Sequence, residues 1–345
     1  MHVTPPIPDS APAMTSGPFA TPTFRARVDA ALARRAPLVS DAAVSVWRVL
    51  DGAGDGVPGV SIDRYGPAAV LNVYDDARLA DDDVTAAAGA ALDALAPLGV
   101  DAVYVKAFAR DRSRLGGDLP DESRTPTPRA GRPVSAPLVV EEYGTRYEVH
   151  PYDGLSTGLF LDLRDHRRAL AEAHPGRVLN LFAYTCAFAM PLGRAGAEVT
   201  NVDVSGRYLE WGRRNLALNG LAPETMRFLR RDAREFLDRA ARRPDQRFDL
   251  VVLDPPTFGA ADRRRGIAAW RAVEDYPALV RAAAAVLAPG GRLFCATNTR
   301  ELAAEGALAR LVTSALGHAP AWRPLPPWPV DVTERGRVAA VLCAP

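Results

Sequence analysis

At 345 residues, the chain is long for a single hydrophobic core and suits two domains of ~100–200 residues each. Hydrophobic residues make up 48% of it and charged residues 24%, which is the balance of an ordinary globular protein. The formal net charge of +1 excludes a strongly basic protein that wraps nucleic acid, but it leaves room for a local basic surface.

The sequence also bears on the compartment in which the protein works. No stretch has the ~20 apolar residues of a membrane-spanning helix, and the first residues lack the apolar segment of a signal peptide. The 3 cysteines are too few for a disulfide framework and too scattered for a zinc site, and no two histidines have the spacing of metal ligands. We therefore expect a cytoplasmic protein with neither a membrane anchor nor a bound metal.

The amino-terminal part divides into a leader and a small domain. Residues 1–40 begin with a proline-rich stretch and continue with an alanine- and arginine-rich stretch that can form one short helix, so we predict a partly disordered leader. Residues 41–137 are predicted to form a small α+β domain followed by a linker. Its strands are expected at 44–50, 60–66, 69–74 and 100–108, its helix at 81–99, and the linker, rich in proline and arginine, at 120–137.

Residues 138–345 show a different pattern, in which apolar strands alternate with helices. Strands are expected at 178–182, 198–204, 226–232, 248–254, 292–298 and 338–344, with helices at 205–221, 233–243, 272–291 and 301–316. Such alternation predicts a mostly parallel sheet covered by helices on both faces, which is a Rossmann-like α/β fold.

In an open parallel sheet, ligands bind beyond the carboxyl ends of the strands. The first strand ends at Phe182, and the next two end at Asp203 and Asp232. The turn after Phe182 lacks the glycines that let a backbone approach a pyrophosphate, which argues against NAD or FAD. An acid at Asp203 can accept both hydrogen bonds of a ribose diol, so the pattern favours a nucleoside cofactor without a phosphate, of which S-adenosylmethionine is the common one. The alternative is that both acids simply stabilise helix starts.

The sequence Asp-Pro-Pro-Thr-Phe at 254–258 follows the fourth predicted strand. Two prolines directly after a buried strand end its hydrogen-bonding ladder and form a rigid elbow. We expect this elbow to aim the Asp254 side chain and the Pro255 carbonyl into the crevice, where Phe258 can stack on a flat substrate such as a nucleobase. The alternative is a loop that merely ends the strand.

Several segments together resemble one family. They are VPGVSIDRYG, EEYGTRYEVHPYDGLSTGLFLDLRDHR, NLFAYT, VDVSGRYLEWGRRNLALNGL and DPPTF. From about Ala43 to the carboxyl terminus, the chain resembles the bacterial 23S rRNA methyltransferases of the class I, S-adenosylmethionine-dependent kind. The resemblance implies a seven-stranded methyltransferase domain at 138–345, S-adenosylmethionine as cofactor and RNA, in particular 23S rRNA, as partner. We expect a monomer or a homodimer.

The resemblance also implies roles for single residues. Asp203 would bind the ribose hydroxyls and Asp232 the adenine, while Arg164 is a candidate for the methionine carboxylate. Residues implied to line the methionine side are Asn180, Phe182 and Ala183. Residues implied to hold the target base are Asp254, Pro255, Pro256 and Phe258, aided by Asn298.

Two features separate the branches of this family. The 5-methylcytosine branch carries an N-terminal PUA domain, whereas some 40 residues precede the shared region here. That branch also uses a cysteine at a position that falls on Asn298, and Cys295 lies three residues earlier, inside a predicted strand. Methylation of cytosine C5 needs a covalent thiolate attack that activates the ring, so 5-methylcytosine chemistry is the less favoured alternative.

The stretch GRLFCATNTR resembles instead the 7-methylguanine branch, which has asparagine and arginine at the positions of Asn298 and Arg300. Guanine N7 already offers a lone pair, so transfer needs positioning more than a strong base. An exocyclic amine would need only acceptors such as Asp254. We therefore predict methyl transfer to a guanine nitrogen of 23S rRNA. A further departure is Cys186, where the family usually has glycine; it could narrow the cofactor turn.

Other interpretations of the sequence stay open. The basic run after the DPPTF motif could hold RNA phosphates or could be an ordinary solvated turn; it consists of Arg263, Arg264 and Arg265. The small net charge also suits a methyltransferase of the same fold that acts on a small molecule. A third possibility is an RNA-binding protein that has lost catalysis, against which the intact Asp203, Asp232 and DPPTF motif argue.

Overall fold

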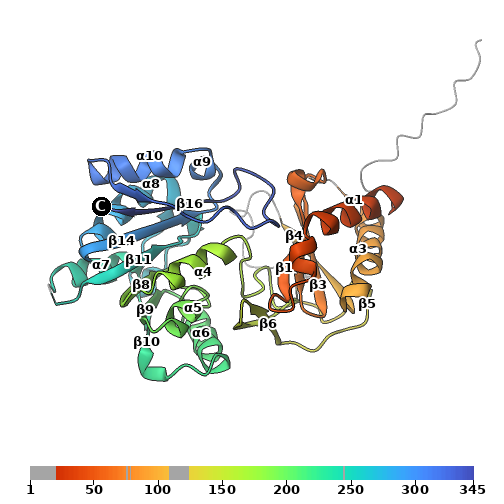
Figure 1. Cartoon of the computed structure of the whole chain (residues 1–345), viewed down its shortest axis with the longest axis horizontal. Coiled ribbons are helices and arrows are strands. Elements are labelled where there is room, and N and C mark those ends of the chain that lie inside the picture. Colours follow the sequence, from red (N-terminus) through yellow and green to blue (C-terminus); the bar gives the residue numbers. More distant parts are fainter. Residues whose placement is uncertain (1–20, 75–76, 78, 109–123, 244) are drawn as a thin grey trace, which may run out of the picture.

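The structure, a computed structural model, describes residues 21–74, 77, 79–108, 124–243 and 245–345 (Figure 1). The proline-rich part of the predicted leader and the start of the predicted linker lie outside the described residues. Among the described residues, no helix is long and apolar enough to cross a membrane.

The amino-terminal unit is a five-stranded sheet in the order β1-β2-β3-β4-β5, with helices packed on one face. Its strands are β1 (Val46–Asp51), β2 (Val60–Tyr65), β3 (Ala68–Tyr74), β4 (Ala102–Phe108) and β5 (Ala130–Gly131), and its helices are α1 (Thr21–Arg34), α2 (Ala36–Val39) and α3 (Asp81–Leu95). The four predicted strands are thus present. Helix α1 buries Phe24 and Val28 in this core, so the domain begins before residue 41, and β5 brings part of the predicted linker into the sheet.

The carboxyl-terminal unit contains the predicted Rossmann-like sheet, with seven strands in the order β10-β9-β8-β11-β14-β16-β15. Strands β8 to β14 of this sheet run parallel, and β16 and β15 are antiparallel to their neighbours. The strands are β8 (Arg177–Leu181), β9 (Glu198–Asp203), β10 (Met226–Arg230), β11 (Phe248–Leu253), β14 (Leu287–Thr297), β15 (Ala321–Arg323) and β16 (Ala339–Ala344). A two-stranded hairpin of β6 (Leu138–Glu142) and β7 (Thr145–Val149) precedes them.

Helices cover both faces of this sheet (Figure 1). One face carries α4 (Arg164–Glu172), α5 (Ala189–Arg194) and α6 (Gly206–Leu218). The other carries α7 (Ala233–Ala241), α8 (Ala272–Ala284), α9 (Arg300–Ala303) and α10 (Ala307–Leu316). Each strand-to-helix connection places a loop at the carboxyl edge of the sheet, which is where ligands bind in such folds.

Three sequence predictions needed correction in this unit. The helix predicted at 272–291 ends at Ala284, and residues 287–291 are the start of β14. The helix predicted at 301–316 is divided into α9 and α10, because Gly306 adopts a left-handed conformation with φ of 68°. The segment around Trp322 lies outside every predicted strand, but it forms the edge strand β15. Its three residues are too short a stretch for a periodic pattern to be recognised.

The two units share an apolar core, and the backbone of the small domain bonds to a buried ion pair of the carboxyl-terminal unit. One apolar core runs continuously from the inner face of β1–β4 through the β6–β7 hairpin to the face of the large sheet covered by α4–α6. Asp331, near the carboxyl end, accepts hydrogen bonds from both terminal nitrogens of Arg164, at 2.7 and 3.0 Å, and from the backbone of Arg48 in β1, at 2.8 Å. The small domain is therefore fixed against the strand edge that carries the predicted site.

Candidate active site at the carboxyl edge of the large sheet

The turn after β8 has an unusual backbone. Phe182, Tyr184 and Cys186 all have positive φ, between 49° and 63°, although none is glycine. Non-glycine residues in this region cost free energy, and such strain is concentrated at functional sites. The predicted residues Phe182 and Ala183 lie in this turn, which closes on the end of β9 through a hydrogen bond from the Ala183 nitrogen to the Val202 carbonyl.

Asp203 ends β9 beside this turn. Its carboxylate accepts hydrogen bonds from the backbone nitrogens of Tyr184, at 2.9 Å, and Ser205, at 2.8 Å. Burial raises its pKa, against the opposing effect of these two donors. No cationic side chain among the described residues pairs with this carboxylate, so its remaining lone pairs can accept hydroxyl donors such as those of a ribose.

Asp232 ends the loop after β10 and caps α7 by accepting from the Arg234 nitrogen. Its carboxylate also pairs with the Arg234 guanidinium, at 2.7 Å. Burial opposes ionisation of Asp232, but the hydrogen bonds from Arg234 outweigh it and lower its pKa. Asp232 therefore stabilises the start of α7, as the alternative interpretation of the sequence expected. Its role in binding the adenine stays a prediction.

A pocket of about 540 Å³ lies next to Asp203, because its lining begins with the following residue, Val204. It is lined by Val204, Ser205, Gly206, Arg207, Arg230, Ala260, Asp262, Arg265 and Ile267. Val204 is 38% exposed there, although it is apolar. This exposed apolar side chain, directly after the ribose-type acid, offers a surface for a flat ring, and the sequence did not assign it a role.

Two residues predicted to bind the methionine part of the cofactor are buried and bind other side chains of the protein. Asn180 is buried within β8, where its amide donates to the Asn201 side chain at 2.9 Å. Arg164 is buried and its terminal nitrogens bind Asp331, so it does not present a free cation to the strand edge. The structure thus places Phe182, Ala183 and Asp203 together and holds Arg164 apart in the contact between the two units.

The loop after β11 presents acceptors without donors. Among the described residues, none donates a hydrogen bond to the Asp254 carboxylate or to the Pro255 carbonyl, whereas the Pro256 carbonyl accepts from the Trp270 indole at 2.7 Å. Burial and the neighbouring Asp162 carboxylate raise the pKa of Asp254 to about 7, against the opposing effect of Arg167. Phe258 is 71% exposed. Acceptors and an exposed ring on one rigid loop suit a planar ligand with N–H donors.

Asn298 meets the same loop from the neighbouring strand. It lies just beyond β14 and is exposed, and its side-chain oxygen accepts from the Thr257 hydroxyl at 3.1 Å. Thr299 donates to the same hydroxyl at 3.2 Å. The structure therefore brings Asn298 to the Asp254–Phe258 loop, as the sequence predicted from two distant segments.

A segment that the sequence did not assign to the site lies across the strand ends. In this connector segment (residues 157–163), the three leucines at 159, 161 and 163 are buried, so Phe160 and Asp162 point the other way. The Phe160 ring contacts Tyr184 in the turn after β8 at 5.4 Å between centroids, and Asp162 acts on Asp254 after β11. Phe160 is 53% exposed, so its ring presents an apolar face to solvent beside the turn after β8.

The predicted basic run forms a short turn, η7 (Arg263–Arg265), within the hairpin that follows Phe258. Asp262 caps this turn by accepting from the backbone nitrogens of Arg264 and Arg265. All three arginine side chains are exposed, and Arg265 also lines the 540 Å³ pocket. This places the basic run at the rim of the site.

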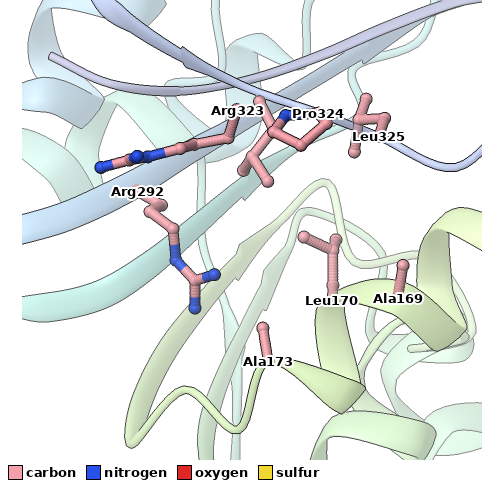
Figure 2. Close-up of a pocket in the computed structure, with 8 residues that line it drawn as sticks. Ala169, Leu170, Ala173, Arg292, Arg323, Pro324 and Leu325 are labelled. Carbon is pink, nitrogen blue, oxygen red and sulfur yellow. The ribbon is translucent and has the colours of Figure 1, made fainter.

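A second pocket, of about 410 Å³, lies elsewhere (Figure 2). It is lined by Ala169, Leu170, Ala173, Arg292, Arg323, Pro324, Leu325 and Leu342. Arg292 pairs in register with Leu250, towards the amino ends of the parallel strands, so this pocket is remote from Asp254. In the described part of the chain, no group of three or more histidine, cysteine or acidic side chains could hold a metal ion.

Fold and edge together define an enzyme with a site for a nucleoside cofactor at the carboxyl edge of the large sheet. The sequence matches the family described as S-adenosylmethionine-dependent methyltransferase over residues 122–319. The chain belongs to this family, which confirms the predicted cofactor.

Curated relatives cover different shares of the chain. A ribosomal RNA large subunit methyltransferase of Deinococcus radiodurans is 32% identical over 288 residues, which are 82% of this chain and 67% of that protein. A ribosomal RNA large subunit methyltransferase K/L of Allochromatium vinosum is 41% identical over 163 residues, 47% of this chain. The matching part of this chain spans only 22% of the length of that K/L protein.

Solved structures confirm the fold. SMU.776, solved in complex with SAH, is similar with a TM-score of 0.77 over 94% of this chain and 81% of its own, at 23% identity. An S-adenosylmethionine-dependent methyltransferase from Agrobacterium tumefaciens is similar with a TM-score of 0.58 over 88% of this chain and 90% of its own, at 21% identity.

The residues present fit the cofactor of the family. Asp203 has free acceptor capacity for two ribose hydroxyls, and Val204 exposes an apolar surface in the adjoining pocket. The strained turn at 182–186 supplies a fixed backbone at the end of β8. No phosphate-binding loop competes for this position, in agreement with a nucleoside that carries no phosphate.

Proposed function

We propose that the protein transfers a methyl group from S-adenosylmethionine to a guanine nitrogen in RNA, specifically in 23S rRNA. The observation that carries this proposal is the loop after β11. No described residue donates to the Asp254 carboxylate or to the Pro255 carbonyl there, and Phe258 is exposed. A guanine offers N–H donors to those acceptors and a flat face to that ring.

The proposed roles divide the edge into two sides. The cofactor supplies an electrophilic methyl group on a sulfonium. On the cofactor side, Asp203 binds the ribose hydroxyls, Asp232 faces the adenine, and Phe182 and Ala183 line the methionine side. On the target side, Asp254 and Pro255 accept hydrogen bonds from the base. Holding a lone pair of the base in line with the methyl group replaces the need for a strong base.

The cysteines support a nitrogen rather than a carbon target. Methylation at cytosine C5 needs an accessible thiolate, but all three cysteines are buried. Burial raises the pKa of the Cys295 thiol well above its ordinary value, and its side chain packs in the core of the large sheet. At the position implied for a catalytic cysteine, Asn298 contacts Thr257 instead.

The relatives' names and the exposed arginines support RNA as the substrate. Both curated relatives are named as methyltransferases of large-subunit ribosomal RNA. We propose that Arg263, Arg264 and Arg265 hold RNA phosphates beside the target pocket. We also propose a cytoplasmic location, since bacterial rRNA is made there, and a monomer or homodimer as the working form.

The test is transfer of labelled methyl from S-adenosylmethionine to rRNA of a strain that lacks this gene, followed by nucleoside digestion and mass analysis. Label in a methylguanosine is expected and would identify the atom. Label in 5-methylcytidine would contradict the argument from the buried cysteines. An absence of label with normal cofactor binding would move the proposal to a small-molecule substrate.

A further inference from the structure

A hairpin of β12 (Phe258–Gly259) and β13 (Trp270–Arg271) rises from the target loop. Phe258 pairs with Arg271 and Gly259 with Trp270, so the hairpin begins at the predicted stacking residue. Trp270 is 5% exposed and is therefore buried, whereas the other residues of the hairpin are half-buried or exposed.

The indole of Trp270 fixes the target loop. Its Nε1–H donates to the Pro256 carbonyl at 2.7 Å. Pro256 has no N–H to donate, so the elbow is held through the Pro256 carbonyl, which accepts this bond. The neighbouring Pro255 carbonyl has no donor among the described residues. The direction of the Pro255 carbonyl and of Asp254 is thereby tied to the position of Trp270.

The ring of Trp270 also contacts two segments of the cofactor side, the turn after β8 and the first turn of α7. It contacts Phe182, in the strained turn after β8, at 5.3 Å between ring centroids. The Arg234 guanidinium lies 6.0 Å from the ring centroid and donates to the carbonyls of Ala268, at 2.9 Å, and Ala269, at 3.2 Å. The same guanidinium pairs with Asp232.

Trp270 thus contacts segments that follow three strands. The Pro256 contact belongs to the loop after β11 and the Phe182 contact to the turn after β8. The Arg234 contact belongs to the first turn of α7, which follows β10. Phe182 and Asp232 are proposed for the cofactor, and the Pro256 elbow for the target base. Because close-packed groups transmit displacement, a shift of any of these segments must also move the buried indole of Trp270.

We infer that Trp270 is a positioning residue that couples the cofactor side of the site to the target side. This inference rests on the proposed function for the identity of the target. Trp270 itself touches neither ligand; it acts through the Pro256 carbonyl on one side and through Phe182 and Arg234 on the other. Its two functions are separable, because the indole N–H serves the target loop and the ring serves the cofactor loops.

The decisive variant is Trp270→Phe, which keeps an aromatic ring and removes the N–H donor. We expect an affinity for S-adenosylmethionine within ~3-fold of wild type and a rate of methyl transfer at saturating cofactor that falls ~10-fold, as for one lost hydrogen bond. Trp270→Leu removes the ring as well and should weaken both. A Trp270→Phe variant with wild-type transfer would overturn the inference.

The matched control is Trp47→Phe in the small domain. Trp47 is fully buried, and its indole nitrogen has no acceptor in the described part of the chain. Because this exchange also trades a buried indole for a phenyl ring, it measures the cost of the smaller side chain alone. Equal losses of transfer in both variants, at equal losses of thermal stability, would mean that Trp270 is only a core residue.

A second readout does not depend on the reaction. The indole N–H signal that disappears in Trp270→Phe identifies Trp270 in the nuclear magnetic resonance spectrum of the wild type. We expect this signal to exchange slowly with solvent and to shift when S-adenosylhomocysteine binds. An unchanged signal at saturation would overturn the coupling. If the wild type binds the cofactor but methylates no RNA, the proposed function fails, and this shift still decides the role of Trp270.

Discussion

The thiol of Cys186 occupies the space that a side chain on Gly212 of α6 would fill. A Cβ at Gly212 would lie 2.5 Å from the Cys186 sulfur, which is far inside van der Waals contact. The thiol is fully buried, so the residue that stands where the family usually has glycine turns towards the helix instead of narrowing the cofactor turn. Burial raises the pKa of this thiol well above its ordinary value.

This contact predicts the effect of Gly212→Ala. The added methyl must displace Cys186 from a turn that already has three positive φ values, so we expect a loss of ~1–3 kcal/mol in the free energy of unfolding and weaker binding of S-adenosylmethionine. Urea denaturation and calorimetry measure the two effects. In a Cys186→Gly background, the methyl has room and the loss should shrink to less than half. An equal loss in both backgrounds would show that the sulfur is not what Gly212 accommodates.

The electrostatics of Asp254 predict a pH dependence. Its pKa of about 7 is raised by burial and by Asp162, and only the ionised carboxylate accepts hydrogen bonds at both oxygens. Methyl transfer should therefore rise as pH increases through about 7, and Asp162→Asn should move this rise to lower pH because a like charge is removed. A profile flat from pH 6 to pH 8, with cofactor binding constant over that range, would rule out Asp254 as the acceptor.

The same shift has a consequence for stability. A carboxyl whose pKa is higher in the folded than in the unfolded protein binds more protons in the folded state, so its contribution is present below the unfolded pKa and is lost as pH rises through the folded pKa. We expect Asp254→Asn to gain stability relative to wild type between about pH 4 and pH 7, as measured by urea denaturation. A gain that is independent of pH over this range would contradict the assignment.

We expect the exposed ring of Phe160 to stack on the target base beside Phe258, because the adjacent Asp162 reaches Asp254 of the target loop. Removing a ring that stacks on a base costs ~1–3 kcal/mol, so Phe160→Ala should raise the KM for RNA by about fivefold or more, with cofactor affinity nearly unchanged. Trp322→Ala supplies the control, because Trp322 is an exposed aromatic residue on the edge strand β15. A loss confined to cofactor affinity would place Phe160 against the cofactor instead.

Much of the architecture was predictable because the large sheet is built from buried strands with strong apolar runs. Strands such as β9 and β11 and the helix capped by Ser205 agree with the predicted ranges to within a few residues. The short strand β15 and the contribution of α1 to the small domain were not predicted, because neither has a pattern that distinguishes it from a connection.

For the site, the sequence placed acids at strand ends but could not show what already binds them. Asp203 and Asp254 keep free acceptor capacity, whereas Asp232 is paired with Arg234. Arg164 is paired with Asp331, which lies close to the carboxyl terminus of the chain. Phe160 lies in a segment that carries the family resemblance, but the sequence did not assign it a role, because its position depends on the buried leucines around it. Long-range partners of this kind follow from tertiary packing and not from local pattern.

The basic turn predicts a change in the salt dependence of RNA binding. Replacing Arg263, Arg264 and Arg265 by glutamine should weaken binding and lower the slope of log affinity against log salt by up to ~2, since each phosphate contact contributes ~0.7 for single strands. The control is the same exchange at three exposed arginines on and after α7, which are Arg239, Arg242 and Arg243. Equal slopes in the two triple variants would identify the turn as an ordinary solvated surface.

The most direct test of the two-sided site compares Asp203→Ala and Asp254→Ala in one experiment, with cofactor affinity measured by calorimetry and methyl transfer measured at saturating cofactor. Asp203→Ala should weaken S-adenosylmethionine binding ~10- to 100-fold, as expected for lost charged hydrogen bonds, and retain transfer once the cofactor is saturating. Asp254→Ala should bind the cofactor within ~3-fold of wild type and lose transfer at least 100-fold. Parallel losses of affinity and transfer in both variants would contradict the division into a cofactor side and a target side.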